Sequence, residues 1–390
     1  MLILKLALRN ILGAGLRTWL NVTVLSFSFV IIIWLQGFYI GMLEQVSDAT
    51  IDAEFGGGQY WNALYDPFDP LSLKDAHSPI QGTLKDLVDS GRAAPVLIVL
   101  GTIYPGGRIM PVLLKGIDPR QAVVSLPSRF LEEASEDLPV LIGTRMAENA
   151  GLETGDTITI QWRDTHGTFD ALEARIVQVM ETIVPTIDNG QMWLPLEKLR
   201  AMTLLENEAT LVVIAKDVRA TLDEPNWIFK NLDFLLSDIK QIVQMRTIGS
   251  AFIYAFLLLL AMLAIFNTQV LSIFRRRKEM GTLMALGFNR TQVIELFTME
   301  GALQGVFAAV VAAIYGIPLL ILSAKGFGLP SELTSQSGFA LGAKLFPSYT
   351  AGLVVGTTLI VLIMTTIVSF LPTRKIAKLK PTDALRGKLP

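Results

Sequence analysis

Four long segments without a charged residue constrain this chain more than any other feature. A helix needs about 20 apolar residues to cross a bilayer. Each of the four is longer than that and contains no Asp, Glu, Lys or Arg: 18–43, 247–274, 301–324 and 345–373. The sequence therefore predicts an α-helical membrane protein with four transmembrane helices. With the residues that lead into it, the third helix is predicted to run over 295–324.

The charges outside these segments predict the orientation of the chain. Residues 42–245 carry 30 acidic and 16 basic residues, whereas most of the remaining cations flank the four segments. Cytoplasmic loops of membrane proteins are enriched in Lys and Arg. If all four segments cross, every basic cluster falls on one side, and residues 44–246 and 325–344 are outside. The predicted cytoplasmic parts are residues 1–17, 275–294 and 374–390.

The first segment is predicted to remain in the membrane as an anchor. It is longer than the core of a signal peptide and lacks a convincing small-residue cleavage site, so a retained anchor is favoured over a cleaved signal. Before it, residues 1–17 alternate apolar residues with Lys5 and Arg9, which predicts an amphipathic helix on the inner membrane surface. A simple extension of the first membrane helix fits the same pattern.

Residues 44–246 mix strand-like and helix-like stretches, which predicts a large α+β extracytoplasmic domain between helices 1 and 2. No cysteine is present, so this domain must be held by its own core. Residues 226–246 are predicted to be helical and to lead into the second membrane helix. The predicted strands are 95–100, 109–116, 139–142, 157–162, 174–181, 191–195 and 210–215, and the predicted helices are 144–150 and 196–204.

The loop between the second and third segments predicts a short helix that can serve as a handle for a cytosolic partner. Four cations open it at residues 275–278. Gly287 is suited to end the helix, and Asn289 with Gln292 three residues later is typical of the cap of the next helix. The apolar side of the short helix is formed by Met280, Leu283, Met284 and Leu286.

Catalytic chemistry is not indicated by the sequence. No phosphate-binding loop with the pattern Gly-x-x-x-x-Gly-Lys-(Ser/Thr) occurs, so any ATPase that drives this protein must be another polypeptide. His77 and His166 are the only histidines, which makes a zinc or nucleophile-histidine site improbable, and Asp66 with Asp69 is interpreted as surface charge. The charge-free segments argue against a proton- or ion-coupled transporter. We therefore predict no catalytic residue, metal or cofactor in this chain.

Motifs in the loop and at the end of the chain resemble those of the FtsX/MacB family of ABC-transporter permeases. The loop motif is a basic residue, Glu-(Ile/Met)-Gly, a small residue with Leu/Ile-Gly, and a membrane helix that opens with Glu-Gly. Its counterparts are Arg277, Glu279, Met280, Gly281, Ala285, Leu286, Gly287, Glu300 and Gly301. Residues 371–386 are similar to the family's C-terminal tail. In the large insert, residues 115–119, 141–156 and 192–196 look like the lipoprotein-releasing LolC/LolE branch.

This resemblance implies a periplasmic domain with two lobes, in an inner-membrane complex of two permease chains and two cytosolic ABC ATPase chains. The second permease is either identical or paralogous, ATP and Mg are bound by the ATPase, and no nucleic acid is involved. The residues expected to couple to the ATPase are Arg277, Glu279, Met280, Gly281, Leu283, Met284, Leu286 and Gly287.

Two further sets of residues are expected to act within the membrane. Small residues let helices pack closely; they are Gly301, Gly305, Ala309, Gly352 and Gly356, with a neighbouring stripe at Ala308, Ala312 and Gly316. Large apolar residues of the first helix either line a groove for a lipid chain or simply face lipid; they are Phe27, Ile31, Trp34 and Phe38.

Four helices cannot readily enclose a large hydrophilic conduit, and the predicted outer domain is nearly as large as the membrane part. We therefore expect a permease that transmits ATP-driven motion to its periplasmic domain. By resemblance, this motion releases lipoproteins from the inner membrane, with a lipoprotein or a periplasmic carrier as a further partner. The alternatives are MacB-like export of a periplasmic small molecule or peptide and FtsX-like regulation of a cell-wall hydrolase.

Overall fold

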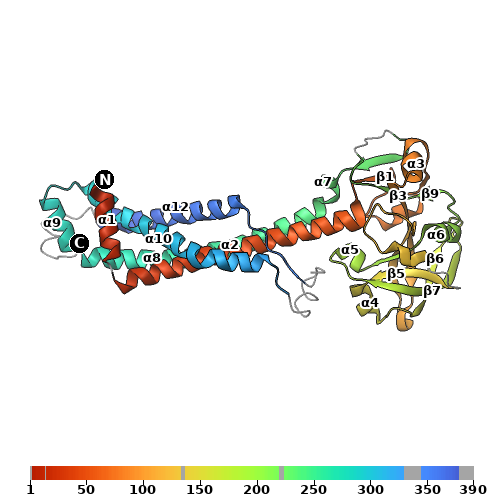
Figure 1. Cartoon of the computed structure of the whole chain (residues 1–390), viewed down its shortest axis with the longest axis horizontal. Helices are drawn as coiled ribbons and strands as arrows, with labels where there is room; N and C mark the ends of the chain where they lie inside the picture. Colours follow the sequence, from red (N-terminus) through yellow and green to blue (C-terminus); the bar gives the residue numbers. More distant parts are fainter. Residues whose placement is uncertain (1, 14, 133–136, 219–223, 329–343, 377–390) are drawn as a thin grey trace. The chain divides into compact units, whose positions relative to one another are not determined.

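The computed structural model describes residues 2–13, 15–132, 137–218, 224–328 and 344–376. The chain forms two compact units, which we call the membrane unit and the α/β unit (Figure 1). The membrane unit comprises Met1–Met42, Ile242–Phe327 and Leu345–Pro390, and the α/β unit comprises Leu43–Gln241 and Gly328–Lys344. The predicted cytoplasmic tail beyond residue 376 and most of the predicted 325–344 loop lie outside the described residues.

Four helices in the described part of the chain are long and apolar enough to cross a membrane. They are α2 (Leu16–Thr50), α8 (Ser237–Arg275), α10 (Arg290–Ala324) and α12 (Ala351–Ile376). The prediction of a helical membrane protein with four such helices is confirmed. α2 continues past the first charge-free segment, over Glu44 and Asp48, because the hydrogen bonds of a helix are local and tolerate polar side chains.

The fourth helix begins later than the charge pattern predicts. Residues before Ala351 are held in an extended form: Leu345 and Phe327 exchange two backbone hydrogen bonds of 3.1 Å, and the N–H of Ser348 donates to the carbonyl of Gly37 at 2.9 Å. Pro347 lies between these contacts and has no N–H for a helix. Tertiary contacts therefore decide where α12 starts.

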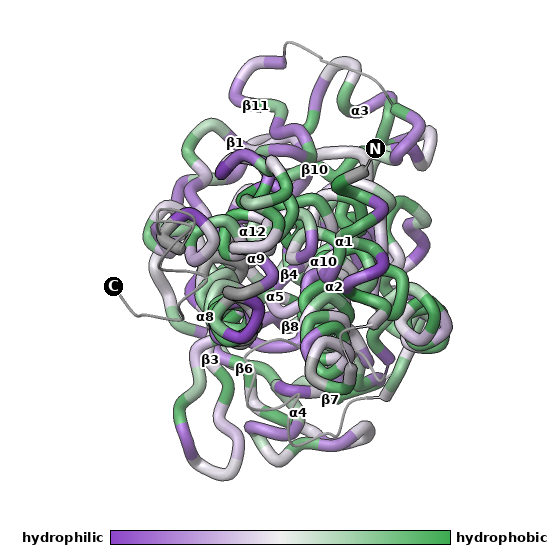
Figure 2. The backbone as a smooth tube through the Cα atoms, turned by 90° about the vertical axis from the view of Figure 1, so that its left-hand side faces the viewer, coloured by the Kyte–Doolittle hydropathy of each residue, from purple (hydrophilic) through white to green (hydrophobic). Residues whose placement is uncertain are grey.

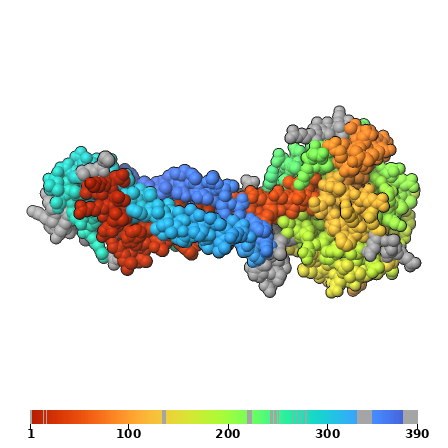
Figure 3. Space-filling model, viewed as in Figure 1, coloured from red at the N-terminus to blue at the C-terminus, as the bar shows by residue number. Residues whose placement is uncertain are grey.

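The N-terminal residues form a separate helix, α1 (Leu2–Leu12). The chain leaves helical geometry before Leu16, where Gly15 has a φ of +74°. Ala7 and Ile11, which share one face of α1, are buried, and Figure 3 shows α1 directly against α10. In Figure 2, hydrophilic bands interrupt the hydrophobic colour of α1. A separate helix is thus correct, and a simple extension of the first membrane helix is wrong.

The α/β unit is built on a nine-stranded sheet of order β11-β1-β10-β3-β4-β8-β5-β7-β6. Its strands are β1 (Gln59–Asn62), β3 (Ala93–Ile103), β4 (Met110–Ile117), β5 (Leu138–Gly143), β6 (Thr157–Arg163), β7 (Phe169–Met180), β8 (Gln191–Pro195), β10 (Leu211–Ile214) and β11 (Trp227–Lys230). β6 pairs both with β7 and with the end of β3. The six strands β3, β4, β8, β5, β7 and β6, in this spatial order, therefore close into a barrel.

Alternation along the strands separates two cores. Successive side chains of a strand point to opposite faces. Leu97 of β3 and Leu114 of β4 belong to the core enclosed by the barrel, whereas the adjacent Val96 and Ile98 belong to a second core on the other face. This pattern lets a domain without disulfides bury apolar side chains on both faces of one sheet.

Short helices complete the unit: α3 (Gly82–Asp89), α4 (Thr144–Ala150), α5 (Pro185–Asp188), α6 (Leu196–Thr203) and α7 (Leu232–Leu235). The predicted helices at 144–150 and near 196–204 are present. The helical prediction for 226–246 is wrong at its start, because residues 227–230 form β11, which pairs with β1. The backbone hydrogen bonds that β11 forms with β1 outweigh the local helical preference of residues 227–230.

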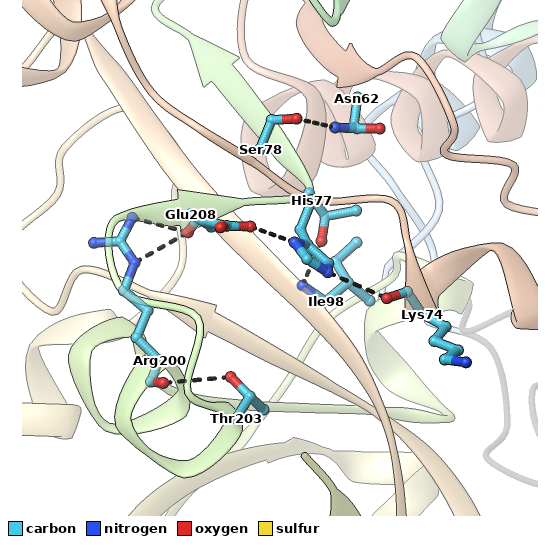
Figure 4. A network of polar contacts seen from close by, with 9 residues as sticks. Asn62, Lys74, His77, Ser78, Ile98, Arg200, Thr203 and Glu208 are labelled. Carbon is cyan, nitrogen blue, oxygen red and sulfur yellow. Dashed lines mark hydrogen bonds and ion pairs between the residues drawn. The ribbon is translucent and has the colours of Figure 1, made fainter. Parts of the chain in front are cut away.

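A polar network joins the two-stranded pair β2 (Ser78–Pro79) and β9 (Glu208–Ala209) to the sheet (Figure 4). The imidazole of His77 contacts the Glu208 carboxylate and, at 3.1 Å, the carbonyl of Lys74. Arg200 donates two hydrogen bonds of 3.0 Å to the Glu208 carbonyl. Among the described residues no group of three or more His, Cys, Asp or Glu could hold a metal. These contacts stabilise Glu208 of β9 from both sides, through His77 and Arg200.

Candidate functional site

A short helix, α9 (Arg277–Ala285), lies between α8 and α10, within the predicted cytoplasmic loop. Gly287 ends it with a φ of +101°. Its N–H donates to the Met284 carbonyl at 3.1 Å, and the N–H of Phe288 donates to the Leu283 carbonyl at 3.0 Å, which is the Schellman pattern. Asn289 and Gln292 then form the predicted capping box of α10. Local sequence therefore defines where α9 ends and where α10 begins.

One face of α9 is packed against the beginning of α10. Met280 contacts Val293 and Phe297 in a buried apolar cluster, with Met284 and Phe288 at its edge. The opposite face is open, and the side chain of Leu286, just after the helix, is 75% exposed. The short helix thus has one face attached to a membrane helix and another available to a partner.

Arg276, the residue between α8 and α9, connects α9 to α10 because it forms ion pairs with a glutamate of each helix. Its Nη1 donates to both carboxylate oxygens of Glu300 on α10, at 2.9 and 3.0 Å. Its Nε donates to Glu279 of α9 at 2.6 Å. Asn10 of α1 donates to the same Glu300 carboxylate at 2.7 Å. We call these four residues the coupling node.

The Arg276–Glu300 pair of the coupling node is mostly shielded from water, whereas the Glu279 side chain is exposed. The side chains of Glu300 and Arg276 are 7% and 23% exposed, and the guanidinium lies 4.9 Å from the ring centre of Phe297. Burial acts to lower the pKa of Arg276, but the carboxylates of Glu300 and Glu279 outweigh it and raise the pKa above its usual value. The arginine therefore stays charged, and removing either member of the buried pair leaves an uncompensated group.

A polar cavity of about 490 Å³ lies beside the coupling node in the membrane unit. Arg9, Arg275 and Gln304 line it together with Arg276 and Glu300. Gln304 is buried, and its Oε1 has no hydrogen-bond partner among the described residues. The node therefore borders a cavity lined largely by polar and charged side chains.

The predicted coupling residues fall into three environments. Met280 and Gly281 are buried, Leu283 and Met284 are half-buried, and Glu279, Leu286 and Gly287 are exposed. The side chain of Arg277 lies outside the description. Sequence reasoning missed Asn10 and Arg276 as members of the node. Arg276 stood out only as one of four consecutive cations, and nothing in the sequence signalled Asn10.

The predicted packing glycines also differ from one another. A Cβ added at Gly301 would lie 1.9 Å from Ser369 Oγ of α12, and one at Gly305 would lie 2.7 Å from Thr365 Oγ1. A Cβ added at Gly352 or Gly356 would have no atom within 4 Å in the part of the chain that the structure describes, so a packing role for these two stays a prediction. Ala309 is partly buried beside a core that contains Ala308 and Ala312, and a Cβ at Gly316 would lie 2.7 Å from Val30.

The four candidates for a lipid groove lie along α2 of the membrane unit. Phe27 is 60% exposed and Ile31 is half-buried. Trp34 and Phe38 stack on Phe327 with ring centres 6.0 Å apart in both cases. Stacking on a residue that follows α10 limits the freedom of these two rings, whereas Phe27 remains open.

Residues 251–381 match the family described as FtsX-like permease C-terminal. The chain carries an FtsX-like permease domain. It is 26% identical over 176 residues to an uncharacterized ABC transporter permease of Methanocaldococcus jannaschii, which covers 45% of this chain and 41% of that protein. It is 22% identical over 320 residues to the lipoprotein-releasing system transmembrane protein LolC of Xylella fastidiosa, covering 73% and 75%. The predicted FtsX/MacB-type permease near LolC is confirmed.

Other similarities are shorter or weaker. The ABC transporter permease YtrF of Bacillus subtilis is 28% identical over 146 residues, which are 36% of this chain and 33% of that protein. The extracellular domain of the noncanonic ABC-type transporter YknZ from Gram-positive bacteria has 11% identity and a TM-score of 0.26, over 42% of this chain and 83% of that domain. The sequence relatives to which this chain is similar are thus named as ABC transporter permeases or as LolC.

Proposed function

We propose that this chain transmits ATP-driven motion from a cytosolic ABC ATPase, through α9, to the other helices of the membrane unit and to the α/β unit. The coupling node carries this proposal. Arg276 and Glu300 tie α9 to α10, and Asn10 ties the same carboxylate to α1. A push on α9 must therefore either move these helices together or break a buried ion pair, which suits a two-state element. ATP and Mg are assigned to the ATPase.

We assign the cargo to lipid-anchored proteins of the inner membrane, released to a periplasmic carrier. The similarity to LolC over 73% of this chain supports this choice. The exposed Phe27 and the half-buried Ile31, Trp34 and Phe38 on α2 would then meet the lipid chains of the cargo. A second permease chain, identical or paralogous, would complete the complex with membrane lipids around it. MacB-like export and FtsX-like hydrolase control are tested by identifying what co-purifies with the chain.

Orientation follows from this function, with the α/β unit on the periplasmic side and α9 in the cytoplasm. The chain has no cysteine, so single cysteines can be introduced at the exposed positions Asp118, Glu148 and Arg290. An impermeant thiol reagent should label positions 118 and 148 in intact spheroplasts, and position 290 only after lysis. Labelling of position 290 in intact spheroplasts would overturn the orientation.

Docking of the ATPase is tested at Leu286. Leu286→Ser removes an exposed apolar side chain at the end of α9 and should weaken association with the ATPase about tenfold, as expected for an apolar contact at the centre of an interface. Folding should be unaffected, because the side chain makes no buried contact. The measurement is a titration of the ATPase that co-purifies with the tagged wild-type chain.

Ile109→Ser is the matched control for Leu286→Ser. Ile109 is also 75% exposed but belongs to the α/β unit. Its replacement should leave ATPase association unchanged. Equal affinity of the wild type and Leu286→Ser would remove α9 as the docking element, and absence of any co-purifying ATPase would contradict the proposed function itself.

A further inference from the structure

The polar cavity beside the coupling node lies where apolar spans of the membrane unit end. Thr18, the first residue of the first candidate span, and Ser272, the last residue of the second, both line it. Asn10 of α1 and Glu300 of α10 form further parts of its wall. In a chain that crosses a bilayer, the ends of the apolar spans lie at the level of the lipid head groups.

The charged side chains that line this cavity have a net charge of +1. Arg276 is paired with Glu300 and Glu279, so these three together contribute −1. Arg9 of α1 and Arg275 of α8 add two positive charges. Both are exposed, and among the described residues no carboxylate lies within 4.0 Å of either guanidinium. Two cations from distant parts of the sequence thus line one cavity, and the described part of the chain supplies neither with an ion-pair partner.

Apolar surface begins next to these cations. Leu271, which also lines the cavity, is 51% exposed. It precedes Arg275 by four residues, so the two side chains are neighbours on one face of α8. On α1, Leu12 follows Arg9 by three residues and is 58% exposed. Each arginine is therefore accompanied by an exposed leucine, which is the arrangement that an amphiphile with an anionic head requires.

We propose that this cavity binds the phosphodiester of an anionic phospholipid, with an acyl chain along Leu271. Arginine presents several N–H donors in a planar fork that matches phosphate oxygens, and Arg9 and Arg275 offer such forks from two helices. The single negative charge of the head balances the net charge of the lining. A zwitterionic phospholipid brings its own cation and leaves that charge unbalanced.

The bound lipid would connect α1 to α8, just as the hydrogen bond from Asn10 to Glu300 connects α1 to α10. With α9 in the cytoplasm, the lipid belongs to the inner leaflet, where anionic lipids attract Lys and Arg. Its part in transmitting ATP-driven motion rests on the proposed function. Its binding does not, because every residue that lines the cavity is in the membrane unit.

The test titrates the purified full chain in detergent micelles with dioleoylphosphatidylglycerol and counts bound lipids by native mass spectrometry. One molecule should bind about tenfold more tightly than dioleoylphosphatidylcholine, which has the same acyl chains and no net charge. Excess inorganic phosphate at constant ionic strength should not displace it, because free phosphate has no apolar part. Equal affinities of the two lipids, or displacement by inorganic phosphate, would overturn the lipid site.

Matched variants locate the bound lipid. Arg275→Gln should weaken the binding of dioleoylphosphatidylglycerol about tenfold, the effect of one hydrogen bond to a charged group. Arg9→Gln should act in the same direction, and the double variant should lose the preference over dioleoylphosphatidylcholine. Folding should be unaffected, because both arginines are exposed and have no ion pair to lose among the described residues.

Arg290→Gln is the control for Arg275→Gln. Arg290 is an exposed arginine of the same predicted cytoplasmic loop, but it does not line the cavity. Its replacement should leave the affinity for the lipid unchanged. Equal effects of the two changes would show that the overall positive charge of the loop attracts the lipid, and would overturn the site. No ATPase takes part, so this outcome is separate from that of the Leu286→Ser experiment.

Discussion

Replacing Gly301 with leucine is expected to destabilise the membrane unit by about 3 kcal/mol or more, at the upper end of overpacking costs. A Cβ at this position would lie 1.9 Å from Ser369 Oγ and 2.3 Å from Ser369 Cβ. Ser369 cannot easily turn away, because it is fully buried and its hydroxyl donates to the Thr365 carbonyl at 2.8 Å. α10 and α12 must separate to admit the new side chain. Unfolding of the purified chain in mixed micelles measures the loss.

Gly352→Leu is the matched control on α12. A Cβ added there would have no atom of the described residues within 4 Å. Since glycine is a poor helix former, this change should be neutral or stabilise by up to about 1 kcal/mol. The double variant Gly301→Leu with Ser369→Gly should recover part of the lost stability. Similar unfolding midpoints for Gly301→Leu and Gly352→Leu would show that the close approach of α10 and α12 does not limit stability.

Arg276→Met should cost about 3–5 kcal/mol, because it leaves the Glu300 carboxylate buried and without its cation. Asn10 alone remains as a partner, and a neutral amide cannot balance the charge. The double variant Arg276→Met with Glu300→Leu removes both charges and should recover most of the stability. The unfolding free energies of the wild type, both single variants and the double variant give the coupling energy.

Arg92→Met provides the exposed comparison for this cycle. Arg92 pairs with Asp217 at 3.0 Å, but the two side chains are 48% and 70% exposed. An ion pair in water contributes about 0–1 kcal/mol, so its loss should be barely measurable. If Arg276→Met were as mild as Arg92→Met, the coupling node would not hold α9 to α10, and the proposed transmission would lose its physical basis.

The short helix α9 could be predicted almost completely from its own residues. Its end depends on Gly287, which adopts a backbone conformation with positive φ, and the following cap depends on Asn289 and Gln292 three residues apart. The membrane helices were predictable for a similar reason, since a run without charges is a property of the run itself. The coupling node was not predictable, because Asn10 and Glu300 are 290 positions apart in the sequence and meet only in the folded chain.

The features that could be predicted from the residues alone are therefore local or compositional: four apolar spans, a separately held α+β insert, and the end of α9. The tertiary structure alone decided that 227–230 is a strand, that β6 closes the barrel on β3, and that α12 starts at Ala351. It also decided that Trp193 Nε1 and Gln191 Oε1 are buried without a hydrogen-bond partner among the described residues. Hydrogen bonds between distant segments select among conformations that local preferences leave nearly equal in free energy, and these contacts exist only in the folded chain.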